Sequence, residues 1–146
     1  MLNRFALVVI IAVAFAAGFV LRNAVVGPAV TVHAAADRVF ELRTYTTHPG
    51  KLEALKSRFR DHTVKLFEKH GMTNVGYWVP QDGPLAENTL IYIVAHSSRE
   101  AAKKSWAGFR EDPDWVKART ASEKDGPINI KVESVFMNPV DFSAIK

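Results

Sequence analysis

The chain contains no cysteine. Disulfides, thiolate nucleophiles, thiolate metal ligands and iron–sulfur clusters are therefore excluded. An excess of charge is also missing: Arg4 and Arg22 are the only charged residues before Asp37, which leaves 17 basic and 15 acidic residues from there on. The net charge of this part of the chain is close to zero, so it gives no reason to expect nucleic-acid binding. Glycine-rich phosphate loops and G-x-S-x-G elements are absent too, and we expect no cofactor.

The composition is that of a folded protein. Of the 146 residues, 48% are hydrophobic and 23% are charged, which is typical of a globular chain. This length suits one domain with a core large enough to fold without covalent cross-links.

One long apolar run precedes the globular part. Residues 5–21 contain neither charge nor proline, a length between that of a signal-peptide core and that of a spanning helix. Ala34-Ala35-Ala36 fits a cleavage site before Asp37, whereas the long spacer before it argues against cleavage. A cleaved signal and an uncleaved membrane anchor therefore both remain open for residues 1–36.

The charges around this run predict its orientation. The amino terminus and Arg4 together outweigh Arg22, so the N-terminus should stay in the cytoplasm and the domain should be exported. We expect the domain in the periplasm, or anchored to the bacterial inner membrane on its outer side. Any membrane contact would then come only through residues 5–21, if they are not removed.

Hydrophobic periodicity predicts the order β-α-β-β-α-β for residues 37–137. The expected elements are a strand over 39–45, a helix from Thr47 to before Gly71, strands over 73–79 and 89–96, a helix from the Ser97–Glu100 capping box with a short restart at Pro113, and a strand over 128–136. Residues 138–146 look like a loosely held tail. This order predicts an α+β, ferredoxin-like fold with a four-stranded antiparallel sheet and both helices on one face. A second copy would cover the other face and make a dimer.

The first strand alternates polar and apolar side chains. Its two faces carry Glu41, Arg43 and Tyr45 on one side, and Phe40, Leu42 and Thr44 on the other. An acid, a base and a phenol in a row are unusual on a buried face unless they are paired. We therefore expect the polar face to point away from the helices, toward a second subunit, with a pocket between the two sheets.

Two motifs carry a family resemblance. F-E-L-R-T-Y-T followed by P-G-K near the start, and S-W-x-x-F-x-x-D-P-x-W over residues 105–115, resemble the NIPSNAP family across about residues 38–137. The resemblance implies a dimeric α+β barrel, in the superfamily of antibiotic-biosynthesis-type monooxygenases, muconolactone isomerases and chlorite dismutases. The family has no settled activity, so the resemblance implies fold and assembly. The export segment departs from the mitochondrial members, whose signalling roles should not transfer.

The candidate site residues lie mainly on strands. Glu41 and His96 are the candidate general bases, and Arg43 and Tyr45 are candidates for holding the polar end of a ligand. Tyr92 and Trp106 complete the expected ligand contacts. Each candidate also has a purely structural alternative. Glu41 and Arg43 could form an ion pair that only holds an interface, and His96 could be a partly exposed histidine at the end of a strand. The aromatic residues could belong to the core.

No metal site is predicted. His62 and His70 are eight residues apart on one helix, which puts them about 12 Å apart, too far to share an ion. No other pair of histidines has a ligand spacing.

Three functions remain open after the sequence is read. The first is an exported homodimer that binds a small apolar or aromatic molecule between its sheets. The second is a cofactor-independent monooxygenase- or isomerase-type enzyme that uses His96 or Glu41 as a base. The third is a structural protein-interaction module. Convergence of Glu41, Arg43 and His96 within hydrogen-bond reach around a closed cavity would favour the enzyme.

Overall fold

The computed structural model describes residues 38–146, so the predicted export segment lies outside the described residues. The strands are β1 (Val39–Thr47), β2 (Thr73–Trp78), β3 (Thr89–His96) and β4 (Asn129–Met137). The helices are α1 (Leu52–Arg58), a π-helical segment (Phe59–Thr63), α2 (Val64–Lys69), a 3₁₀ turn (Pro84–Glu87), α3 (Arg99–Glu111) and α4 (Pro113–Ser122). Within this range no helix is both long and apolar enough to cross a bilayer.

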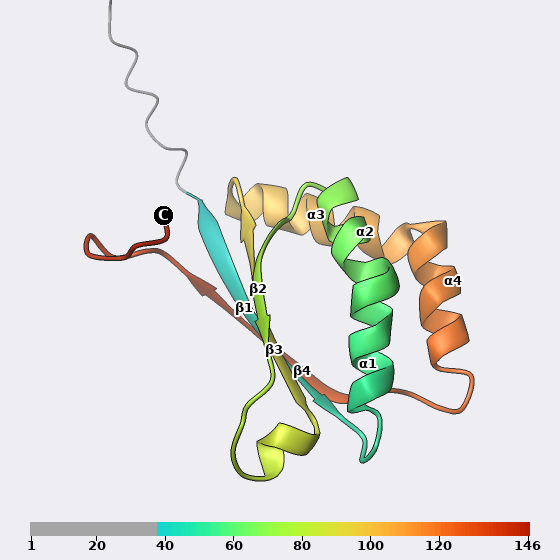
Figure 1. The fold of residues 1–146 in the computed structure, drawn as a ribbon. Coiled ribbons are helices and arrows are strands. Elements are labelled where there is room, and N and C mark those ends of the chain that lie inside the picture. The colour runs from blue at the N-terminus through green and yellow to red at the C-terminus, as the bar shows by residue number, and fades with distance from the viewer. Residues whose placement is uncertain (1–37) are drawn as a thin grey trace, which may run out of the picture. The chain divides into compact units, whose positions relative to one another are not determined.

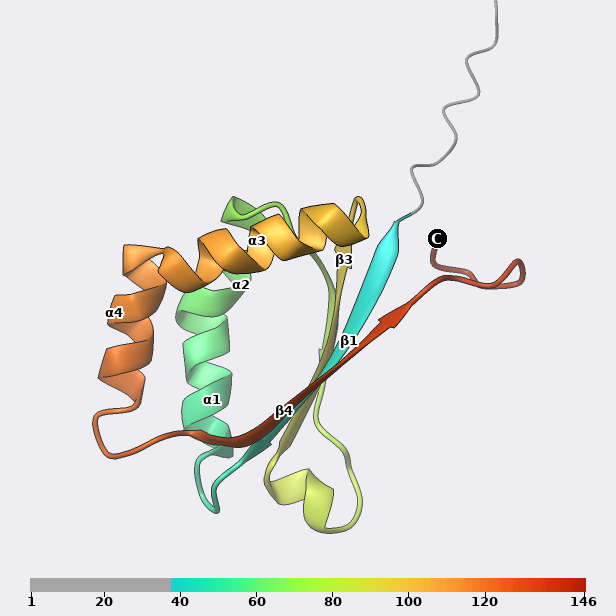
Figure 2. The ribbon, with the colours of Figure 1, turned by 180° about the vertical axis from the view of Figure 1, so that it is seen from behind.

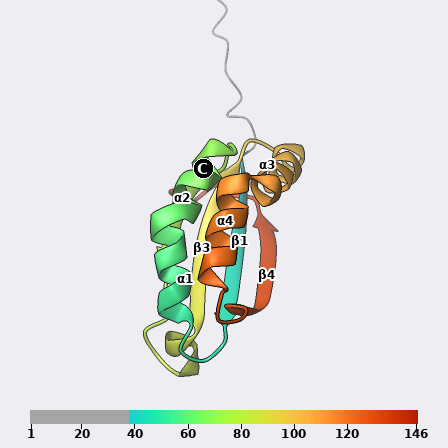
Figure 3. The same ribbon diagram turned by 90° about the vertical axis from the view of Figure 1, so that its right-hand side faces the viewer.

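The four strands form one antiparallel sheet in the order β2-β3-β1-β4. All four labelled helices lie on the same side of this sheet, whereas the chain after β4 lies on the other side (Figures 1 and 2). Seen from the helix side, α1 and α4 run over the strands and α3 crosses near one end (Figure 3). The predicted ferredoxin-like α+β fold is confirmed.

The first helical region differs in detail from its prediction. Thr47 does not cap it, because Thr47 is the last residue of β1 and a turn with Gly50 at φ +73° comes between. The helix begins at Leu52 and changes to π-helical pitch at Phe59 before it continues as α2. In the wide turn the hydroxyl of Thr63 donates to the carbonyl of Arg58 at 3.1 Å.

The second helical region consists of α3 and α4, and a side chain caps the N-terminus of each. Ser98, one residue after the predicted cap, accepts from the backbone N–H of Ala101 at 3.0 Å. Asp112 accepts from the N–H of Asp114 at 2.9 Å and so begins α4. The same carboxylate binds Lys69 at 2.8 Å, and the ring nitrogen of His70 lies 2.6 Å from it. Asp112 therefore ties the end of α2 to the α3–α4 corner.

The core between sheet and helices is largely aromatic. Phe67 is fully buried and lies within 4.9–6.0 Å, centroid to centroid, of Phe59, Tyr92, Trp106 and Phe109. These edge-on and tilted contacts are the arrangements that aromatic rings prefer. They lock α2 and α3 onto β3.

The structure corrects the predicted orientation of β1. Glu41, Arg43 and Tyr45 point toward the helices, because Trp106 of α3 binds Glu41 and the ring of Tyr45 packs on Phe59. Polar side chains were expected to avoid this side, but here they are paired with one another, which removes the cost of burying them.

The apolar face of β1 is consequently the one turned away from the helices. Leu42 lies opposite Ile93 on β3 and Val135 on β4, so these three side chains share what we call the open face. Trp78 of β2 shares it as well: a Cβ placed on Gly76 would lie 2.5 Å from the indole, so the ring packs against that glycine. Val135 and Trp78 are about half exposed, at 55% and 51%.

The aromatic core predicts a large cost for truncation at its centre. Phe67→Ala should lower the free energy of unfolding by about 3–5 kcal/mol, because the ring is fully buried among others and leaves a cavity. Urea denaturation of the full chain measures this change. The matched control Val116→Ala, half exposed on α4, should stay within about 0.5 kcal/mol of wild type. Equal effects at both positions would contradict this packing.

Candidate functional site

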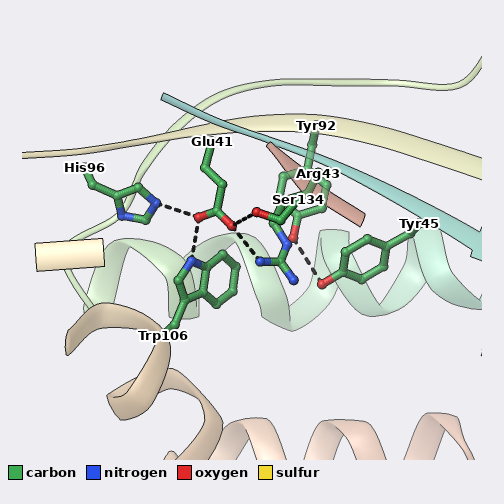
Figure 4. Close-up of polar contacts among 7 residues, drawn as sticks. All are labelled: Glu41, Arg43, Tyr45, Tyr92, His96, Trp106 and Ser134. Carbon is green, nitrogen blue, oxygen red and sulfur yellow. Dashed lines mark hydrogen bonds and ion pairs between the residues drawn. The ribbon is translucent and has the colours of Figure 1, made fainter. Parts of the chain in front are cut away.

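A buried carboxylate lies at the centre of the polar residues. Glu41 is 1% exposed, and four donors surround it (Figure 4). Oε1 accepts from Arg43 Nη1 at 2.7 Å and from Ser134 Oγ at 2.6 Å. Oε2 accepts from Trp106 Nε1 at 2.6 Å and from His96 Nε2 at 3.0 Å. We call these five side chains the Glu41 cluster.

Strand register brings the Glu41 cluster together. Arg43 lies directly opposite Ser134 on β4. His96 on β3 lies opposite Val39, which is two residues before Glu41 and therefore on the same face of β1. Trp106 reaches the carboxylate from α3. Four separate elements therefore meet at a single side chain.

The cluster keeps Glu41 ionised. Burial alone would raise the pKa of this carboxyl, but the hydrogen bonds from His96, Ser134 and Trp106, helped by the charge of Arg43, lower it to about 2. Because both oxygens are already occupied by donors, a carboxylate in this state is unsuited to take a proton. This geometry argues against Glu41 as a general base and favours a role in positioning its partners.

Arg43 is held firmly but not saturated. Nη1 donates to Glu41, and the guanidinium lies over the Trp106 ring at 4.2 Å and near the Tyr45 ring at 5.7 Å. Its Nε is buried and has no hydrogen-bond partner among the described residues. The hydroxyl of Tyr92 donates to that of Tyr45 at 3.2 Å beside it. Tyr92 itself is fully buried, so any contact with a ligand would pass through Tyr45.

His96 has one free ring nitrogen. Glu41 accepts from Nε2, so Nδ1 is the ring nitrogen that does not contact the carboxylate. This Nδ1 is buried and has no partner in the described part of the chain. A histidine oriented by a carboxylate is the arrangement found in general-base dyads.

The helix-facing side of β4 is open beside the cluster. Ile130 is 58% and Val132 is 42% exposed, and both lie on the same face as Ser134. Arg43 lies across from Ser134, and 17% of its side chain is exposed. Its guanidinium therefore lies on the same sheet face as these exposed apolar side chains.

The other residues considered in the sequence analysis pack in the core, lie on the surface or join helices. Trp106 holds α3 on the sheet, as the core interpretation expected, while also donating to Glu41. His62 is exposed and His70 binds Asp112. Across residues 38–146, no group of three or more His, Cys, Asp or Glu side chains could hold a metal ion.

Ser134 is the functional candidate that the sequence analysis did not single out. Its place in the alternating pattern of the last strand puts it on a definite face, but only the register with β1 shows that it faces Glu41. Nothing within β4 alone signals this contact.

The fold and cluster define a ferredoxin-like domain of the dimeric α+β barrel type. The sequence profile of the NIPSNAP family matches residues 40–144, and the chain belongs to this family. No match is found among curated protein sequences.

Solved structures agree with this assignment. A NIPSNAP family protein of unknown function from Agrobacterium tumefaciens is 25% identical, with a TM-score of 0.66 over 78% of this chain and 98% of that one. A Streptomyces coelicolor monooxygenase in complex with nanaomycin D is 16% identical, with a TM-score of 0.51 over 72% and 89%. SnoaB, a cofactor-independent oxygenase from Streptomyces nogalater, is 14% identical, with a TM-score of 0.51 over 75% and 99%. The two Streptomyces proteins share the fold.

The ionised state of Glu41 predicts an acid-sensitive fold. A carboxyl whose pKa falls from 4.5 to about 2 on folding stabilises the protein above pH 4.5, and this contribution is lost as the pH falls toward 2. In Glu41→Gln the acid limb of the stability curve should be flatter, and stability at pH 7 should fall by about 3–5 kcal/mol because buried donors lose their charged acceptor. Urea denaturation from pH 7 to pH 2 measures both.

An exposed carboxylate provides the control for this prediction. Glu53→Gln removes a surface ion pair with Lys56, and its stability curve should follow wild type within about 1 kcal/mol at every pH. Parallel acid limbs for wild type and Glu41→Gln would show that folding does not lower the pKa of this carboxyl.

Proposed function

We propose that this chain is an exported homodimeric domain that binds a small apolar or aromatic molecule, whose polar oxygen is held by Arg43. The observation that carries the proposal is the unpartnered, buried Nε of a guanidinium fixed in place by Glu41. A guanidinium presents its donors as flat pairs, and such a pair matches a carboxylate or carbonyl oxygen.

The surroundings of Arg43 favour an aromatic or apolar ligand. The guanidinium is bordered by the rings of Trp106 and Tyr45, and the exposed Ile130 and Val132 lie beside it on β4. Binding sites for small molecules typically combine apolar walls with a few fixed polar groups. We place the ligand between the sheet and the helices, in place of the inter-sheet position expected from the sequence.

Glu41 acts in this proposal by positioning. It holds Arg43 through Oε1 and fixes the Trp106 indole through Oε2. Both groups would otherwise have several rotamers to choose from, and ordering them in advance lowers the entropic cost of binding.

The open face supports the homodimer. Leu42, Ile93, Val135 and Trp78 form an apolar surface that no helix within residues 38–146 covers (Figure 1). Monomeric soluble proteins rarely leave large apolar patches in water. A second copy related by a two-fold axis would cover this face with an identical one. Export is proposed from the apolar run and its flanking charges alone.

Exchange of Arg43 for lysine tests the ligand. Arg43→Lys keeps a cation beside Glu41 but lacks the flat donor pair. Native mass spectrometry of the full chain, purified from its own host, should show a bound organic mass on wild type that is lost or at least tenfold depleted in the variant, an effect of about 1.4 kcal/mol or more. The same spectra give the subunit number and show whether residues 1–36 have been removed.

A matched control separates local from general effects. Arg60→Lys changes an exposed arginine on the π-helical segment and should retain the bound mass. Identical ligand content in Arg43→Lys and wild type would overturn the site. A wild-type protein that carries nothing would leave the structural interaction module as the better interpretation.

A second candidate function rests on His96. Its Nδ1 has no partner among the described residues while Glu41 fixes the ring through Nε2, and in the neutral tautomer this nitrogen can accept a proton from a bound molecule. Glu41 lies within hydrogen-bond reach of both Arg43 and His96, which meets one of the two conditions of the enzyme hypothesis; the other is a closed cavity around them. The fold is shared with SnoaB, a cofactor-independent oxygenase, which favours the same reaction class for this alternative.

Replacement of His96 by glutamine separates catalysis from structure. The side-chain amide N–H₂ of His96→Gln can still donate to Glu41 from about the place of Nε2, but the variant lacks a ring nitrogen that could take a proton. If the chain is an enzyme, the variant should keep the bound mass and lose at least 100-fold in turnover of that compound in aerated buffer, followed by liquid chromatography and mass spectrometry. Unchanged turnover would exclude His96 as the base.

A further inference from the structure

The end of the chain is held in shape, contrary to the loosely held tail predicted from the sequence. Ser143 N donates to the carbonyl of Val140 at 3.0 Å, and Ser143 Oγ donates to the carbonyl of Ile145 at 2.7 Å. These hydrogen bonds close residues 140–146 into what we call the C-terminal turn.

The C-terminal turn gathers apolar side chains in water. Phe142 is 87% exposed, the highest value among the large hydrophobic side chains of the described residues, and Val140 and Ile145 are 50% and 55% exposed. Val140 and Ile145 also line a hollow against the sheet, whereas Phe142 does not, so its ring points away from the domain. Single exposed apolar side chains need no explanation, but a group of them at one place marks a protein or membrane contact.

The C-terminal turn lies next to the point at which the chain enters the domain. Arg38 is the first described residue, and its Nη1 donates to the carbonyl of Lys146 at 3.4 Å. The start of β1 and the C-terminus lie at the same end of the sheet, and the 3₁₀ turn that contains Leu85 lies at the other end (Figure 1). The end of the domain nearest to the preceding chain therefore carries the exposed Phe142.

The sequence before Arg38 favours a bilayer as the partner. Residues 5–21 are the apolar run whose length allows it to span a membrane, and Arg22 follows it directly. Residues 22–37 separate this run from the domain, and even a fully extended chain of this length reaches only roughly 55 Å. A retained run would therefore tether the domain close to the membrane by the end that carries the C-terminal turn.

Such a tether makes a small apolar patch effective. An apolar ring with two aliphatic neighbours would bind a bilayer only weakly by itself, because stable attachment takes two signals. When a span in the same chain supplies the first signal, the second contact becomes intramolecular and its effective concentration is high. The cations of Arg38 and Lys146 lie beside the apolar side chains, and this combination suits the boundary between lipid headgroups and acyl chains.

We propose that the C-terminal turn inserts Phe142 into the outer surface of the inner membrane and so fixes the orientation of the anchored domain on the bilayer. The proposal rests on the export in the proposed function, and it takes residues 5–21 to be retained. The contact uses neither the open face nor Arg43, so it is compatible with a dimer and with a bound ligand.

The absence of native cysteine allows a test with a single probe. In Phe142→Cys the thiol carries an environment-sensitive nitrobenzoxadiazole dye, whose rings take the place of the phenyl ring. The full chain is reconstituted into vesicles of phosphatidylcholine and phosphatidylglycerol that contain spin-labelled lipids. Lipids labelled near the headgroup should quench the dye by about half or more, and lipids labelled at the end of the acyl chain should quench it less, because interfacial insertion is shallow.

The same dye on Leu85→Cys is the matched control. Leu85 is also apolar and 53% exposed, but it lies at the other end of the sheet, so spin-labelled lipids should leave its dye unquenched. Equal quenching at both positions, or none at either, would overturn the proposal. A blue shift at position 142 that spin-labelled lipids do not quench would mean that the turn contacts protein, for instance a second copy, and would overturn it as well.

A second measurement keeps the native ring. Asp141→Cys places an exposed thiol beside Phe142, and its reaction with a membrane-impermeant maleimide is followed in spheroplasts of the host. This thiol should react several times more slowly than that of Leu85→Cys. Adding Phe142→Ser should remove most of the difference, because no ring then holds the turn at the bilayer, and detergent should make all rates equal. Equal rates for Asp141→Cys with and without Phe142→Ser would contradict the proposal.

The remaining outcomes separate this proposal from the export on which it rests. If the full chain keeps residues 1–36 and stays in the membrane but the dye is not quenched, the docking of the turn is wrong and export stands. If neither thiol reacts until detergent is added, the domain is not exported and both fail. If residues 1–36 are removed and the chain is found in the soluble periplasmic fraction, the docking fails, whereas export and the ligand site at Arg43 do not.

Discussion

The arrangement of this domain depends on one buried carboxylate. Glu41 receives hydrogen bonds from β1, β3, β4 and α3, so a single side chain joins three of the four strands to a helix. An isolated charge in this position would be prohibitively unstable, and four donors are what makes it tolerable. The same bonds fix the geometry of Arg43 and His96. Stability and any chemistry of the site therefore share the same contacts.

Much of the fold could be predicted from the sequence because its periodic patterns are strong. Alternation in β1 and β4 and the apolar spacing of α1 and α3 give the order of elements, and this order leaves few topologies to choose from. The cap of α3 was misplaced by one residue, since two consecutive serines compete for the position. The π-helical pitch has no signal in the periodic pattern.

The orientation of β1 could not be predicted from the strand alone. Whether Glu41 and Arg43 face solvent or core depends on donors that lie 55 to 93 residues away, on His96, Trp106 and Ser134. The usual preference of charged residues for the surface gave the wrong side. The sequence nonetheless singled out Glu41 and Arg43 as candidates, because three polar side chains on one face of a strand mark a special environment whichever way the strand is turned.

The π-helical segment gives the first helical region a property that a plain helix lacks. A π-helical turn holds one residue more than an α-helical one, so the segment Phe59–Thr63 accommodates an extra residue without changing the direction of either flanking turn. Leu55 before it and Phe67 after it are both fully buried against the same core. If one residue were removed from this segment, the region could run as a plain α-helix, with Leu55 and Phe67 still on the same side. The π-helical segment is therefore a point at which this helix can lose a residue while its contacts with the core stay the same.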